Sequence, residues 1–122
     1  MHEWRNGRAL LLLVVVVMVV VSGAGPLARV MAGETPGCPF EAKVALAHVW
    51  ENRLEAGIDG GWFGDAEPGY DDWLAVLWWR WWPDVTNGAL YFVGPGDAAR
   101  MPWLRVRTGR WECPGTWVES WW

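Results

Sequence analysis

The sequence predicts an α+β domain, with helices first and a short antiparallel hairpin or sheet at the end of the chain. A segment without helix breakers runs from Phe40 to Ala56, with apolar residues at helical spacing. Apolar and charged residues alternate from Trp103 to Arg107, and Thr108-Gly109 is a typical two-residue turn into a second strand, Arg110 to Cys113. Helices and strands that occupy separate parts of a chain are typical of α+β architecture.

The composition is that of one globular domain, and it excludes several classes of protein. The chain has 122 residues, of which 52% are apolar and 13 are tryptophan. It therefore has enough apolar mass to form a core and is not a disordered chain. The net charge is −4, with Lys and Arg at only 10 positions. Because nucleic-acid binding requires a basic surface, we expect no nucleic-acid partner.

Residues 1–24 are typical of a secretory signal peptide. Two arginines near the start precede an uninterrupted apolar run from Ala9 to Val21, and the small residues Ser22-Gly23-Ala24 follow. We therefore expect export, cleavage after residue 24 and a mature domain over residues 25–122. The alternative is an uncleaved membrane anchor, because no charge interrupts residues 9–28.

Cys38 and Cys113 are the two cysteines of the chain. An exported chain folds in an oxidising compartment, so we expect a disulfide between them, and two buried free thiols are the alternative. A bond that closes so long a loop stabilises the fold by about 4 kcal/mol, because it restricts the unfolded chain.

The long helix is expected to be amphipathic. Pro39 suits the first position of this helix, and Gly57 suits its left-handed end. One face carries Ala42, Ala45, Leu46, Val49 and Arg53. The charged residues and one histidine fall largely elsewhere on the helix: Glu41, Lys43, His48, Glu51 and Glu55.

Three further elements follow the long helix. Ile58 to Gly69 is a loop rich in Gly and Asp, after which Asp71 and Asp72 begin a second helix. The segment from Trp73 to Trp82 is apolar almost all round, which is typical of a buried helix, so its tryptophans are expected in the core. Ala89 to Val93 is expected as a short buried strand.

Few residues of the chain are suited to catalysis. No phosphate-binding glycine loop occurs, and loss of residues 1–24 leaves His48 as the one histidine, expected in solvent. We therefore expect no metal and no cofactor. Glu34 stands out because it follows the apolar segment Val30 to Gly33 just before the long helix. Burial at such a place favours the protonated carboxyl that a general acid needs.

Two segments resemble the family of spore-cortex-lytic enzymes and cell-wall hydrolases. The residues from Ala28 to Arg53, ARVMAGETPGCPFEAKVALAHVWENR, are similar to that family's opening pattern, A-R-x-x-x-x-E-A-R-G-E-P-x-E-G-x-x-A-V-A-x-V-x-x-N-R. The residues from Asp84 to Phe92, DVTNGALYF, resemble its later pattern, D-P-T-x-G-A-L-Y-F/Y. Trp103 and the closing hairpin also resemble the end of the family's domain, so the resemblance covers about residues 28–113.

The resemblance implies a small lysozyme-like domain that cleaves the glycan strands of peptidoglycan, with Glu34 as the general acid. Asn52 and Arg53 match the family's helix-end pair, and they are candidates for bracing Glu34 or contacting the glycan. The alternative is an ordinary helix end at which Arg53 binds the last carbonyl groups. Tyr91 and Trp103 are the candidates for binding the sugars, and a place in the core is the alternative for Tyr91. Further aromatic faces for stacking are offered by Trp62 and Trp111.

The resemblance also implies where the protein acts. Its partner is then bacterial peptidoglycan, and the protein itself is secreted or located in the cell envelope. We expect a monomer that contacts the membrane only through an uncleaved N-terminal segment.

Two reaction routes and two other functions stay open. A hydrolase needs a second carboxylate, and the candidates are Asp59, Asp65, Glu67, Asp71, Asp72 and Asp84. A lytic transglycosylase needs only Glu34, because the 6-hydroxyl of the sugar closes on C1. The family has a longer segment where residues 58–83 lie, and this chain contains no Gln. A peptidoglycan-binding module without catalysis is therefore the alternative, and a tryptophan-rich membrane-associated protein is a third.

Overall fold

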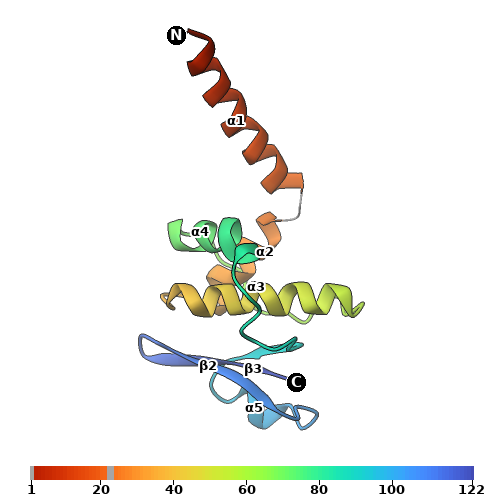
Figure 1. Ribbon diagram of the computed structural model, residues 1–122. Coiled ribbons are helices and arrows are strands. Elements are labelled where there is room, and N and C mark those ends of the chain that lie inside the picture. The colour runs from red at the N-terminus through yellow and green to blue at the C-terminus, as the bar shows by residue number, and fades with distance from the viewer. Residues whose placement is uncertain (1, 22–23) are drawn as a thin grey trace.

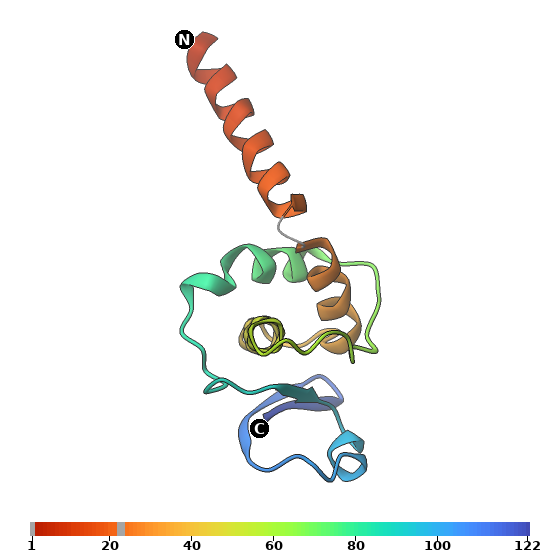
Figure 2. The same cartoon turned by 90° about the vertical axis from the view of Figure 1, so that its right-hand side faces the viewer.

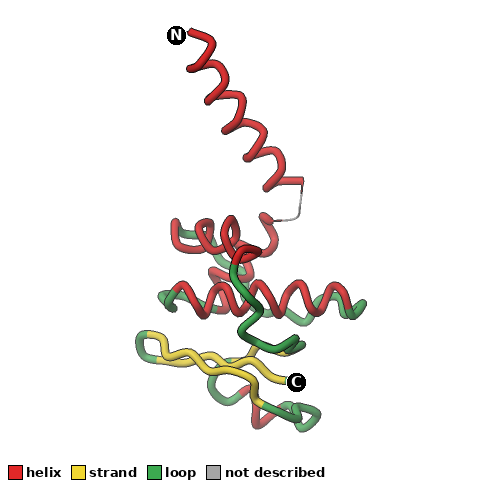
Figure 3. The backbone as a smooth tube through the Cα atoms, viewed as in Figure 1, coloured by secondary structure: helices red, strands yellow, loops and turns green. Residues whose placement is uncertain are grey.

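The computed structural model describes residues 2–21 and 24–122, and it confirms an α+β fold with the sheet at the C-terminal end (Figures 1 and 3). The sheet is three-stranded and antiparallel, in the order β1-β3-β2. Along the chain the elements are α1 (His2–Val21), α2 (Ala24–Glu34), α3 (Phe40–Glu55), α4 (Tyr70–Trp78), the 3-10 helix η1 (Trp79–Trp81), β1 (Tyr91–Val93), α5 (Asp97–Arg100), β2 (Arg107–Cys113) and β3 (Thr116–Trp121).

Helix α3 lies at the centre of the domain. Figures 1 and 2 show α2 and α4 on one side of it and the sheet on the other, and α3 contacts both layers. Its residues from Ala42 to Ala47 and Val49 are buried, and three of them are alanines, which let neighbouring elements approach closely. The core therefore runs from Met31 on α2 through α3 to Phe92 and Val118 on the sheet.

The N-terminal helix α1 projects away from the domain (Figures 1 and 2), and its residues from Asn6 to Met18 are exposed. Ser22 and Gly23 of the expected cleavage site lie outside the described residues. Within residues 2–21 and 24–122, no helix is long and apolar enough to cross a membrane. Cleavage and anchoring both stay predictions.

The hairpin turn is not where the sequence analysis placed it. The turn between β2 and β3 is Pro114-Gly115, and Gly115 adopts the left-handed conformation with φ 72°. Thr108-Gly109 instead lies within β2, at an irregularity of the pairing with β3, where the Trp111 ring covers Gly109. The expected strand from Trp103 to Arg107 is therefore wrong except for its last residue, and the expected strand from Ala89 to Val93 shortens to β1.

The tryptophan-rich segment is also less buried than expected. Helix α4 ends at Trp78, and the 3-10 helix η1 follows. Trp79 is buried, whereas Trp73, Trp78, Trp81 and Trp82 are exposed. Because α4 packs on α2 and α3 from the outside of the domain, its Ala75 and Val76 face the core, whereas its Trp73, Leu77 and Trp78 are exposed.

A buried ion pair holds α3 and α4 together. Lys43, expected on the polar face of its helix, is only 2% exposed, and its Nζ lies 2.7 Å from Asp72 Oδ1. The same Nζ donates to the carbonyl oxygen of Thr35 at 2.7 Å. Asp72 in turn accepts from the backbone N–H of Gly69 at the start of α4. The lysine is therefore an internal link between α2, α3 and α4, and Asp72 is a structural residue.

The disulfide and the C-terminal end of α3 agree with the expectations from the sequence. Cys38 and Cys113 are bonded, with their Cα atoms 4.6 Å apart, which joins the start of α3 to the end of β2. Gly57 has the expected left-handed conformation, with φ 73°. Pro39 caps the helix from outside rather than occupying its first turn.

We expect Lys43→Met to lower the free energy of unfolding by about 3–5 kcal/mol, because it leaves the buried Asp72 carboxylate without its partner. The double variant Lys43→Met/Asp72→Asn should recover part of this loss, since the amide oxygen still accepts from Gly69 and no buried charge remains. Denaturant unfolding with the disulfide intact measures both. A double variant as unstable as the sum of its single variants would contradict the pairing.

Candidate active site

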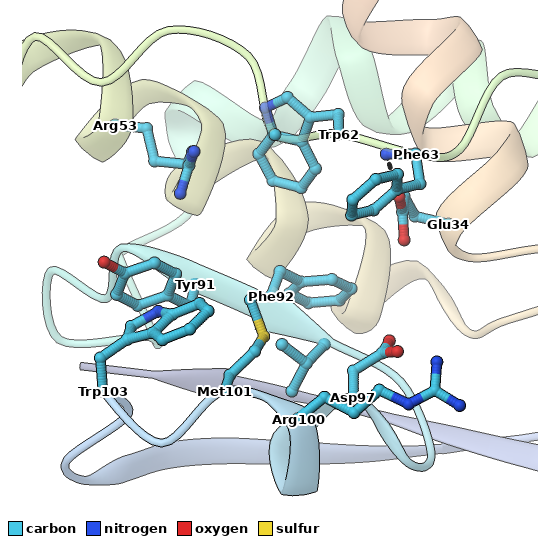
Figure 4. A pocket seen from close by; sticks show the side chains of 12 residues that line it. Glu34, Arg53, Trp62, Phe63, Tyr91, Phe92, Asp97, Arg100, Met101 and Trp103 are labelled. Carbon is cyan, nitrogen blue, oxygen red and sulfur yellow. Dashed lines mark hydrogen bonds between the residues drawn. The ribbon is translucent and has the colours of Figure 1, made fainter.

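A cavity of about 470 Å³ lies between the loop after α3 and the edge formed by β1 and α5. Figure 4 shows Trp62, Phe63 and Glu34 along one side, and Tyr91, Trp103, Met101 and Arg100 along the other. Its lining residues are Glu34, Arg53, Gly61, Trp62, Phe63, Tyr91, Phe92, Val93, Asp97, Arg100, Met101 and Trp103.

Glu34 is the last residue of α2, and backbone groups of the loop fix its carboxylate. Oε1 accepts hydrogen bonds from the N–H of Phe63 at 3.1 Å and the N–H of Gly64 at 2.6 Å. Both hydrogen bonds end on Oε1, and neither involves Oε2. The carboxyl is thus oriented by the main chain, and one of its oxygens stays available for a bound molecule.

Two glycines allow the loop to come this close to α2. A Cβ on Gly64 would lie 2.6 Å from the backbone nitrogen and Cγ of Glu34, and a Cβ on Gly33 would lie 2.3 Å from the nitrogen of Asp65. Real side chains do not tolerate such distances. The contact between the loop and Glu34 therefore requires glycine at both positions.

Polar contacts from α2 and α3 hold the same loop. Arg29 Nε donates to Asp65 Oδ1 at 2.7 Å, and the backbone N–H of Ala66 donates to the Arg29 carbonyl. Arg53 Nη2 donates to the Gly60 carbonyl at 2.8 Å. The loop is thus attached at both ends, with the residues that contact Glu34 between these attachments.

Arg53 joins the two walls of the cavity. Its Nη1 donates to the carbonyl of Leu90 at 2.8 Å, just before β1, while its Nη2 bonds the loop. The guanidinium also lies 5.6 Å from the Trp62 ring and 5.7 Å from the Tyr91 ring. Arg53 lines the cavity, and its polar contacts position the aromatic side chains rather than Glu34.

Asn52 lies away from the cavity lining. Its Nδ2 donates to Asp84 Oδ2 and to the Ala89 carbonyl, both at 3.1 Å. Asp84 also accepts from the N–H and hydroxyl of Thr86 and from the N–H of Gly88. Asn52 therefore supports the turn that precedes β1, and its effect on the cavity is indirect.

The aromatic residues divide between the cavity and the core. Tyr91 and Trp103 lie on the same wall, and Trp103 is 54% exposed. Trp62 stacks on Trp50 at 5.6 Å, which fixes the orientation of its ring at the opposite wall. Trp111 packs against Phe92 and the core, outside the cavity lining, so the structure does not bring it to the other candidate residues.

Several lining residues were not among the site residues expected from the sequence, and three of them bear on the chemistry of the site. Phe63 is 93% exposed at the rim, and Asp97 and Arg100 lie on the short helix α5. Gly94-Pro95-Gly96 directly before Asp97 was the available signal, because such a turn after a strand favours a new helix start. His48, expected in solvent, instead contacts the Trp82 carbonyl and packs edge-on against Trp79.

The second carboxylates expected from the sequence do not line this cavity. Asp72 is bound to Lys43, Asp65 pairs with Arg29, and Asp84 is held by its own turn. Asp97 is the other carboxylate among the lining residues. In the described part of the chain, no group of three or more His, Cys, Asp and Glu side chains is placed to hold a metal ion.

The carboxyl group of Asp84 has a lowered pKa. Burial acts to raise its pKa, but the hydrogen bonds from Thr86, Asn52 and Gly88 favour the ionised form and outweigh burial, so the pKa is lowered below 3.8. The turn before β1 is thus built on a charged carboxylate.

Comparisons with protein-family models, with curated proteins and with solved structures find no match to this chain.

We expect Asp84→Asn to lower the free energy of unfolding by about 1–3 kcal/mol, because it weakens several hydrogen bonds at once. The lowered pKa means that the wild-type contribution is present above about pH 4 and is lost as pH falls through the folded-state pKa. Unfolding measured from neutral to strongly acidic pH should therefore show a shallower acid loss in the variant. Asp59→Asn, in the exposed loop, is the control, and an unchanged acid slope in Asp84→Asn would contradict this role.

We expect Gly64→Ala to move the loop away from Glu34, because the new Cβ meets the backbone of α2. Stability should fall by about 1–3 kcal/mol, and the amide of Phe63 should exchange faster with solvent. Gly25→Ala, where a Cβ meets nothing within 4 Å, is the matched control and should leave both quantities nearly unchanged. Equal effects of the two substitutions would refute the close-approach argument.

Proposed function

We propose that this protein cleaves the glycan strands of peptidoglycan, with Glu34 as the general acid and base. One observation carries the proposal: a carboxyl group fixed by two backbone N–H groups stands at the wall of an open cavity lined by aromatic rings. The resemblance of residues 28–53 and 84–92 to cell-wall hydrolases supports the same assignment of Glu34.

The walls of the cavity suit a chain of sugar rings. Pyranose rings present apolar faces that stack on aromatic side chains, and Trp62, Phe63, Tyr91 and Trp103 supply such faces on two sides. The guanidinium groups of Arg53 and Arg100 add hydrogen-bond donors for hydroxyl, acetamido and carboxylate oxygens. Polar donors among aromatic faces distinguish this cavity from a purely apolar one.

The reaction that fits one acid is the lytic transglycosylase route. Glu34 donates its proton to the glycosidic oxygen, and the bond from that oxygen to C1 of the N-acetylmuramic acid unit breaks. The 6-hydroxyl of the same sugar then forms a bond to C1 and returns its proton to the Glu34 carboxylate. The products are an anhydro end and a new free 4-hydroxyl, and no water is consumed.

The hydrolytic route remains the alternative because Asp97 lines the same cavity. Its Oδ2 accepts from the backbone N–H of Gly94 at 3.1 Å, so its carboxyl is also oriented by the main chain. In that route Asp97 activates a water molecule or bonds to C1, and the product carries a reducing end.

The disulfide between Cys38 and Cys113 indicates an oxidising setting outside the cytoplasm. Peptidoglycan also lies outside the cytoplasm. The disulfide therefore supports the proposed location, that of a secreted or envelope-bound protein of a bacterium, and we propose that it acts as a monomer.

The test is digestion of purified peptidoglycan, with the released fragments read by mass. We expect Glu34→Gln to lower turnover by about 100- to 10,000-fold, because the amide cannot deliver a proton. Glu55→Gln, at the exposed end of α3, is the matched control and should digest as the wild type does. Anhydro ends identify the transglycosylase route, and reducing ends that disappear in Asp97→Asn identify the hydrolytic one.

If the wild type binds intact peptidoglycan but releases no fragments, the proposed enzymatic activity is wrong. The alternative function, a peptidoglycan-binding module without catalysis, would then be favoured. Equal turnover by wild type and Glu34→Gln would show that Glu34 is not the general acid.

A further inference from the structure

A second aromatic surface, separate from the cavity, covers the outer face of α4 and η1. We define this tryptophan surface as Leu54, Trp73, Leu77, Trp78 and Trp81, each more than a third exposed. Trp78 and Trp81 contact each other at 5.2 Å instead of packing into the core, and Trp81 is 72% exposed. The proposed glycan cleavage uses none of these side chains.

The tryptophan surface continues onto α1. A cavity of about 300 Å³ lies between them, lined by Val15 and Met18 of α1 together with Leu54, Leu77 and Trp81. Figures 1 and 2 both show α4 at the end of the domain from which α1 projects. The two elements therefore form one apolar region at one end of the molecule.

The shape of this region points to one kind of partner. The nine consecutive residues from Leu10 to Met18 are all exposed and apolar, so they surround the helix on every side. The groove of a folded protein covers one side of a helix, whereas a fluid layer of acyl chains covers all sides at once. Exposed apolar areas of this kind mark binding or membrane surfaces. The exposure of apolar residues on every side of α1 favours a membrane over a protein groove.

The chemistry of tryptophan agrees with a lipid surface. Tryptophan prefers the boundary between headgroups and acyl chains, because its ring is apolar and its N–H is a donor. Arg80 lies beside the tryptophan surface with its guanidinium 5.3 Å from the Trp79 ring, placed to meet phosphate groups. Asp71 on the same helix is exposed and Glu51 lines the same cavity, so the tryptophan rings rather than the charges carry the argument.

We propose that the tryptophan surface lies at the headgroup level of a lipid bilayer, beside α1. The folded domain thus contacts the bilayer through its own residues as well as through the N-terminal helix. This inference does not rest on glycan cleavage, and either can fail without the other.

The test is hydroxyl-radical footprinting of the full chain bound to vesicles of phosphatidylcholine and phosphatidylglycerol, with oxidation of each tryptophan read by mass. Without a lipid contact, Trp81 at 72% exposure should be oxidised faster than Trp122 at 44%, which lies at the other end of the domain. With the contact this order reverses, and Trp81 becomes at least about fivefold slower than Trp122. Trp81 remaining faster than Trp122 on vesicles would overturn the proposal.

Two further arms separate lipid from other partners. Protection of Trp81 that weakens when protein is diluted at constant lipid would indicate a second copy of the chain and would also overturn the proposal. Trp81→Ser should raise oxidation of Trp78 relative to Trp122 on the same vesicles, whereas Trp103→Ser, the same change at an exposed tryptophan outside this surface, should not. If Trp81→Ser fails to fold, the wild-type footprint still decides.

Discussion

The buried ammonium group of Lys43 is the contact on which the arrangement of the helices depends. It binds Asp72 of α4 and the carbonyl of Thr35, the residue that follows Glu34. Thr35 is fully buried, and its hydroxyl donates back to the Met31 carbonyl of α2. One charged group therefore orients α4 and also fixes the chain directly after the candidate catalytic residue. A buried charge has this effect because it remains favourable only while every partner stays in place.

Glu34 is held from its other side by the loop, through backbone groups rather than side chains. Backbone N–H groups do not titrate and have few ways to rotate, so they keep the carboxyl oriented whatever its protonation state. The arrangement has a steric requirement, because Gly33 and Gly64 must both lack a Cβ. It also explains why Arg53 serves the loop and the aromatic walls, since the orientation of Glu34 is already set by the main chain.

Sequence patterns predicted the features that depend on local residues, and they failed where a distant partner decides. Helix α3, the left-handed Gly57 and the Cys38–Cys113 bond follow from spacing and compartment. Gly109 and Gly115 both suit a turn, and only the pairing of β2 with β3 selects the second. The pattern of α4 shows that it is apolar but not that Trp73, Leu77 and Trp78 stay exposed. Helical spacing placed Lys43 on the polar face of its helix, because its partner Asp72 lies 29 residues away in the sequence. Asp97 lies in the cavity because of the path of the chain after β1. Gly94-Pro95-Gly96 indicates a turn at this place but not where the turn leads.

The positions of the two aromatic regions make the two proposals compatible. The cavity lies on the sheet side of α3, lined by β1 and α5, whereas the tryptophan surface lies on the side of α1 and α4 (Figures 1 and 4). A domain that rests on a bilayer through α4 therefore keeps its cavity clear of the lipid. Under the two proposals together, this orientation presents Glu34 to glycan strands near the membrane, because peptidoglycan lies outside the membrane. The proposed membrane contact would then limit cleavage to strands close to the lipid, and would select which part of the wall is cut without any change in the cavity itself.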